Sequence, residues 1–264
     1  MNQILLAIAS GMFYLLATLL LALQFKQNRP ENQVTKSHLF STAVALLLHA
    51  LLLGSLLPVS QGINLSFFNS LTLFAWVIAL VGLVVGLSNR LEFIGLIIFP
   101  ICIVSMILAL TFPGPVTRPV DFTLLLDIHV LLSIVAYGIL SSAALLALVL
   151  ALQDYQLHHH ITGRLGNLLP PLLSVERLMF QLIMAGFGTL TLALITGFMF
   201  TTDWFNHKIL FSCLAWLVFL VLLIGRYVAG WRGRKAIRWT LGGVLALMLA
   251  FFGTKLVMEF ILSR

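Results

Sequence analysis

The chain has 264 residues, of which 61% are hydrophobic and 9% are charged. In a soluble domain about a quarter of the residues are charged, so this composition excludes an ordinary soluble domain and indicates a polytopic membrane protein. The formal net charge of +7 does not indicate nucleic-acid binding, because most basic residues lie in short loops between apolar runs. We therefore expect no nucleic-acid partner.

Apolar runs long enough to cross a hydrocarbon core about 30 Å thick recur along the whole chain. They predict an all-α integral membrane protein in which eight transmembrane helices form one bundle, a single polytopic domain over residues 1–264. The predicted spans are residues 4–23, 38–57, 71–87, 93–112, 122–152, 174–200, 209–229 and 237–262.

The basic residues between these runs predict the orientation of the chain in the membrane. No basic residue precedes the first run, and Lys26, Arg29 and Lys36 follow it, which is typical of a retained span rather than a cleaved signal peptide. With the N-terminus outside, the inner loops hold about three times as many basic residues as the outer ones. We therefore expect a multi-pass membrane protein with both termini extracytoplasmic.

One apolar run, LDIHVLLSIVAYGILSS, carries an ionisable side chain, His129. On a helix, His129, Ser133, Tyr137 and Ser141 follow one another at intervals of four residues and fall within a narrow sector of one face. Because an ionisable group inside a membrane span is costly and usually faces a protein interior, His129 is a candidate functional residue. Ser133 and Tyr137 are candidates to line the same pocket.

A second histidine, His49, is expected at a similar depth. At 1.5 Å per residue it lies about 16 Å from the inner end of its span, and His129 lies about 10 Å from the outer end of its own. Two histidines at one depth on different helices can hold a haem iron from both faces. Alternatively, each is a buried histidine hydrogen-bonded to a carbonyl or hydroxyl group. The residues alone leave both interpretations open.

Further polar residues gather in the predicted outer loops. Arg118, Trp204, His207 and Lys208 are candidate contacts to haem propionates, and the alternative is ordinary chemistry of the membrane interface. The triplet at 158–160 is either a metal site or a solvated helix end, and we expect no metal other than haem iron. The sequence offers no hydrolytic or redox constellation, so we expect no catalytic residue and no enzyme.

Four stretches carry a family resemblance: His49 in LLLHALLL, His129 in LDIHVLLSIVAYGILSSAALLALVLALQDYQL, PPLLSVERLMFQLIMAGFGTLTLALITGF from Pro170, and KILFSCLAWLVFLVLLIGRYVAGWRGRKA from Lys208. With these the sequence resembles the cytochrome c assembly protein family, in its short branch of YpjD- and HemX-like inner-membrane proteins. The resemblance implies a haem-binding protein of haem handling or cytochrome c assembly, with haem b held between His49 and His129 as transmembrane axial ligands.

The chain also departs from the pattern of the haem-delivering members. Their Trp-rich outer loop is reduced here to Trp204, and Ile224 stands at a family histidine position. The resemblance therefore does not imply a complete haem-to-apocytochrome ligase.

Two alternatives remain, and the partners expected beside haem and membrane lipids depend on them. In the first, a non-catalytic HemX-like regulator binds a cytoplasmic tetrapyrrole-synthesis enzyme, or another membrane protein, through loops 152–173 and 230–238 without haem. In the second, the chain is a transporter, for which broken helices or an inverted repeat would be expected. Neither feature, and no internal repeat, is visible in the sequence.

Overall fold

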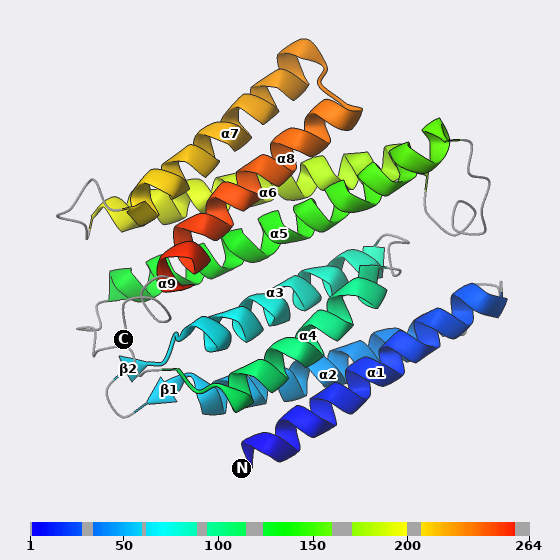
Figure 1. Cartoon of the computed structure of the whole chain (residues 1–264), viewed down its shortest axis with the longest axis vertical. Coiled ribbons are helices and arrows are strands. Elements are labelled where there is room, and N and C mark those ends of the chain that lie inside the picture. The colour runs from blue at the N-terminus through cyan, green and yellow to red at the C-terminus, as the bar shows by residue number, and fades with distance from the viewer. Residues whose placement is uncertain are drawn as a thin grey trace. The chain divides into compact units, whose positions relative to one another are not determined.

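The computed structural model describes residues 2–27, 34–59, 62–88, 94–114, 124–159, 171–199 and 207–256. Within these residues the regular structure is helical except for one antiparallel pair of two-residue strands, β1 (Pro58–Val59) and β2 (Gly62–Ile63). The prediction of an all-helical architecture is therefore confirmed for these residues, apart from the two short strands (Figure 1).

Eight long helices follow one another along the described chain, one for each predicted span. They are α1 (Gln3–Gln27), α2 (Val34–Leu56), α3 (Phe67–Ser88), α4 (Gly95–Thr111), α5 (Leu124–His158), α6 (Leu172–Phe198), α7 (His207–Ala229) and α8 (Gly233–Met248), which continues as a π-helix (Leu249–Gly253) and α9 (Thr254–Leu256). Seven of the described helices are long and apolar enough to cross a membrane, whereas α4 has 17 residues. A helix of that length spans about 25 Å, at the lower end of the range for a transmembrane helix.

Several helix ends lie four to six residues from the predicted ones, among them the end of α5 and the start of α8. α5 continues to His158 instead of ending at Leu152. α8 begins at Gly233 instead of Ile237, because Gly230 and Gly233 have φ angles of 62° and 54° that allow the chain to reverse direction directly after α7. Hydropathy misses both ends because the additional helical residues are largely polar.

The chain divides into two compact units, unit 1 (Met1–Val120) and unit 2 (Asp121–Arg264), with four long helices in each. In unit 1, α1 packs along α2 and α4, and α3 packs along the same two helices. In unit 2, α5 packs along α6 and α8, and α7 packs along the same two helices. Each unit is therefore a four-helix bundle with its own core, and the helices of each bundle can be followed in Figure 1.

A glycine allows α5 and α6 to approach closely in unit 2. A Cβ added at Gly186 would lie 2.6 Å from both Cγ and Cδ2 of Leu140, a fully buried side chain, and 3.3 Å from Ile139. A Cβ at Gly188, on the same helix, would have no neighbour within 4 Å among the described residues. The packing of these two helices therefore requires a glycine at position 186 but not at position 188.

We predict that Gly186→Ala lowers the stability of the protein and that Gly188→Ala does not. The first change overpacks the contact with Leu140, at a cost of about 1–3 kcal/mol. The second replaces an uncrowded helical glycine, which gains up to about 1 kcal/mol of helix propensity. Thermal unfolding of both purified variants in one detergent measures the difference, and a melting temperature for Gly186→Ala at or above that of Gly188→Ala would contradict this account.

Candidate functional site

His129 is held in a defined orientation by the neighbouring helix of unit 2. Its Nδ1 atom lies 2.9 Å from the carbonyl oxygen of Ala193 and 3.2 Å from the hydroxyl of Thr196, both on α6. A carbonyl can only accept a hydrogen bond, so Nδ1 carries the proton and Nε2 carries the lone pair. Among the described residues, Nε2 meets no hydrogen-bond partner. This is the tautomer in which histidines bind metals, with the other nitrogen donating to a carbonyl group.

The ring of His129 occupies space that only a glycine leaves free. A Cβ at Gly197 of α6 would lie 2.8 Å from Cε1 of His129 and 3.2 Å from Nδ1. Ala193, Thr196 and Gly197 thus form a seat for the imidazole. Sequence reasoning identified His129 but missed these three residues, because a backbone acceptor and a small side chain have no distinctive pattern in an apolar helix.

The residues of the predicted polar face of α5 contact two different helices. The Tyr137 hydroxyl donates to the carbonyl of Leu247 on α8, 2.8 Å away, and its ring centroid lies 6.0 Å from that of Phe251 in the π-helix. His129, in contrast, contacts α6. Residues four apart drift by about 40° per step, so over eight residues the face has turned by about 80°. Ser133 lies half-buried between them.

His49 is placed very differently from His129, in the core of unit 1. Its Nδ1 atom lies 3.3 Å from the hydroxyl of Tyr14 and its Nε2 atom lies 3.0 Å from that of Thr72. The Ser105 hydroxyl donates to Thr72 across 3.2 Å, which completes a chain of four side chains with one from each helix of the unit. All four are essentially inaccessible to solvent. In this arrangement neither nitrogen of His49 is presented to a ligand.

The remaining predicted contacts are only partly described. Arg118 and Trp204 lie outside the described residues. His207 and Lys208 begin α7 and are exposed. Their contact with haem propionates therefore stays a prediction.

The histidines at the end of α5 bond to their own helix. Nδ1 of His158 lies 2.9 Å from the carbonyl of Asp154, and Nδ1 of His159 lies 2.9 Å from that of Tyr155. His160 lies outside the described residues. The described part of the chain contains no group of three or more side chains placed to hold a metal ion.

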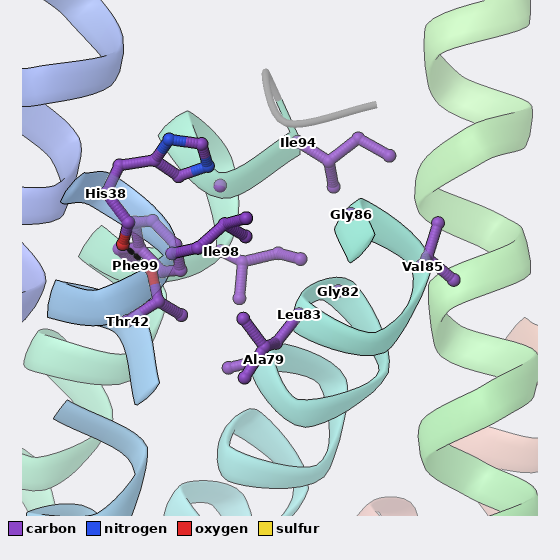
Figure 2. A pocket seen from close by; sticks show the side chains of 12 residues that line it. His38, Thr42, Ala79, Gly82, Leu83, Val85, Gly86, Ile94, Ile98 and Phe99 are labelled. Atoms are coloured by element: carbon purple, nitrogen blue, oxygen red, sulfur yellow. Dashed lines mark hydrogen bonds between the residues drawn. The ribbon is translucent and has the colours of Figure 1, made fainter. Parts of the chain in front are cut away.

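A pocket in unit 1 lies between α2, α3 and α4 (Figure 2). Its lining is mostly apolar, with His38 and Thr42 as its polar side chains, and its volume is about 30 Å³. That volume suits a water molecule, whereas sites for drug-sized ligands occupy roughly 300–1,000 Å³. The pocket as it stands does not accommodate a porphyrin.

A buried carboxylate fixes the turn between α7 and α8. Oε1 of Glu176, whose side chain is 4% exposed, lies 2.8 Å from Arg226 and 2.9 Å from Arg232. At the same turn, Arg234 pairs with Asp154 across 2.6 Å. Sequence analysis missed Glu176, although a single acidic residue in the apolar stretch LLSVERLMF is a usable signal. These arginines therefore form ion pairs inside unit 2.

We predict that Glu176→Gln destabilises the protein by about 1–3 kcal/mol, because it removes a charge that two arginines share in a buried position. Asp154→Asn is the matched control. Its ion pair with Arg234 is largely exposed, so its loss costs at most about 1 kcal/mol. Thermal unfolding of both variants measures the two losses, and equal losses would contradict the structural role of Glu176.

Comparison with known proteins places the chain among membrane proteins of one family. Residues 36–262 match the family described as Cytochrome C assembly protein. The chain is 34% identical over 229 residues to Inner membrane protein YpjD of Escherichia coli (strain K12), covering 84% of this chain and 87% of the relative. It is 26% identical over 196 residues to Protein HemX of Bacillus subtilis, covering 70% of each. No solved structure matches. The chain is a multi-pass inner-membrane protein that belongs to the cytochrome c assembly protein family.

Proposed function

We propose that this protein binds haem b in the inner membrane and acts in haem handling or cytochrome c assembly, without a catalytic step of its own. The observation that carries the proposal is the seat of His129. The Ala193 carbonyl fixes the proton on Nδ1, and Gly197 leaves room for the ring, so that Nε2 is available as an axial ligand. Bound haem would supply an iron centre whose redox potential its ligands tune.

The second axial ligand predicted from the sequence is His49. For Nε2 of His49 to reach an iron, the ring must release the Thr72 hydroxyl, with which it forms a hydrogen bond of 3.0 Å. Among the described residues, the Thr72 hydroxyl would then keep its hydrogen bond with Ser105, 3.2 Å away. Ligation by His49 therefore costs the hydrogen bond to Thr72 in unit 1. Ligation by Nε2 of His129 breaks no described hydrogen bond in unit 2.

We predict that wild-type protein, purified with haem supplied during expression, shows a low-spin haem spectrum with split α and β bands after reduction. His129→Ala should abolish this spectrum. Gly197→Ala, which displaces the ring, should weaken haem binding roughly tenfold, as expected for the loss of a support behind a metal ligand. Gly188→Ala on the same helix is the control and should bind haem normally, because a Cβ there meets no described neighbour.

Absorption spectra and haem titration measure these effects. If Gly197→Ala and Gly188→Ala bound haem equally well, the seat would have no role. A colourless wild type under the same conditions would contradict the haem proposal.

The proposed orientation places both termini outside the membrane, so that the first turns of α5, with His129, lie in the outer half. The support is the distribution of basic residues, which also puts the α7–α8 turn in the cytoplasm. In this orientation His129 lies in the half of the membrane that borders the compartment in which cytochromes c are assembled.

We predict that reporter fusions at Asn28 and Gly233 are active only for a cytoplasmic reporter, and that fusions at Gly62 and Gly114 are active only for an extracytoplasmic one. The physical reason is that basic loops are retained on the cytoplasmic side. Paired alkaline phosphatase and fluorescent-protein fusions provide the measurement. The reverse pattern would rule out the proposed orientation.

A second candidate function is a haem-free partner of a tetrapyrrole-synthesis enzyme, as the HemX-like branch suggests. The observation that favours it is the ordered α7–α8 turn, where Glu176 holds Arg226 and Arg232 in place. The neighbouring Arg177 and Arg238 are exposed and available to an acidic protein surface. A colourless wild type would favour this second function.

A further inference from the structure

The two units share one packing plan. In each, the first helix packs along the second and fourth, and the third packs along the same two. Corresponding helices also begin at nearly constant separations. The second, third and fourth helices of the two units start 138, 140 and 138 residues apart, at Val34 and Leu172, Phe67 and His207, and Gly95 and Gly233. From the second helix onward, the helix starts of the two units thus keep nearly the same spacing along the chain.

The same separation reveals a similarity in sequence that is otherwise inconspicuous. Residues 75–83 read AWVIALVGL and residues 215–223 read AWLVFLVLL. Without a gap, five of these nine positions are identical, at a separation of 140 residues. This is the separation at which the third helices α3 and α7 begin.

Equivalent positions also have equivalent roles. The indoles of Trp76 and Trp216, on the third helices, each donate a hydrogen bond of 2.9 Å to the second helix of their unit. At the other contact, the first helix donates to a carbonyl of the second, from Gln3 to Ser55 in unit 1 and from His129 to Ala193 in unit 2. These two acceptors are 138 residues apart, as are Val34 and Leu172, the first residues of α2 and α6.

The centres of the two units have diverged. At the separations given above, His49, Thr72 and Ser105 of unit 1 correspond to Phe187, Ser212 and Gly243 of unit 2. Of these three residues only Ser212 keeps a hydroxyl, so a hydrogen-bonded chain through all three positions cannot form in unit 2. Instead, the ring of Phe187 stacks on Trp216, with centroids 5.4 Å apart.

We propose that the chain is a duplicated four-helix unit whose two copies have specialised, and that only the second copy binds the ligand. In unit 1, a series of hydrogen bonds links the side chains of four helices, which are Tyr14, His49, Thr72 and Ser105. His49 is a structural tie in this chain and not a haem ligand, since moving it would leave the hydroxyls of Tyr14 and Thr72 without this partner in a buried site. Unit 2 offers the Nε2 atom of His129. The assignment of haem to unit 2 rests on the proposed function, whereas the role of His49 does not.

The test compares His49→Gln, which keeps a donor and an acceptor for Tyr14 and Thr72, with His129→Gln in the full-length protein. We expect the haem content of His49→Gln to stay within twofold of wild type and its haem to keep the spin state of wild type, whereas the haem content of His129→Gln should fall at least tenfold. Loss of the low-spin spectrum in His49→Gln, with an unchanged melting temperature, would overturn the proposal.

Two measurements on haem-free protein decide the role of His49 independently of haem. Diethyl pyrocarbonate, which acylates accessible imidazole nitrogens, should modify His129 at least tenfold faster than His49, as read by mass spectrometry. Tyr14→Phe and His49→Ala should each lower the melting temperature, and the double variant should lose less than the sum because both break one chain. Modification of His49 as fast as His129, or strictly additive losses, would overturn the structural role. A colourless wild type would contradict the haem proposal. The structural role of His49 would then be decided by these two measurements alone.

Discussion

Inside an apolar bundle every polar side chain must find a partner, and this requirement shapes both units. Several buried polar groups meet it by a hydrogen bond to a neighbouring helix of the same unit. Ser10 donates to Ala45, Trp76 to Leu46 and Tyr137 to Leu247, each to a backbone carbonyl. His129 follows the same rule with one nitrogen and leaves the other without a described partner. In a bundle built this way, an available lone pair marks the place where a ligand can bind.

The helices themselves could be predicted from the sequence because hydropathy reports directly on membrane spans. All eight predicted spans have a helix in the structure. The ends of α5 and α8 could not be predicted from hydropathy. One is extended by polar residues at the helix end, and the other is set by the conformations of Gly230 and Gly233. Such ends depend on local backbone geometry and pairing, which a hydropathy pattern does not contain.

The candidate site was predictable only in part. His49 and His129 look alike in the sequence, since each is one imidazole in an apolar run. What separates them is which groups the neighbouring helices bring to the two ring nitrogens. Two hydroxyls engage both nitrogens of His49, whereas the Ala193 carbonyl and the Thr196 hydroxyl engage one nitrogen of His129. A carbonyl acceptor exists at every residue, so its identity emerges only from helix packing.

The repeat escapes notice in the sequence for a related reason. Apolar side chains of similar size replace one another in a core at little cost, so identities fade while the packing arrangement of the helices and the spacing of their starts persist. Identity is retained where a side chain has a specific partner, as with Trp76 and Trp216, whose indole groups bond to a neighbouring helix. A buried polar chain behaves differently, because losing one member leaves the next unsatisfied. It is therefore kept whole, as around His49, or lost nearly whole, as around Phe187, and a duplicated bundle can stabilise one copy while the other evolves a binding site.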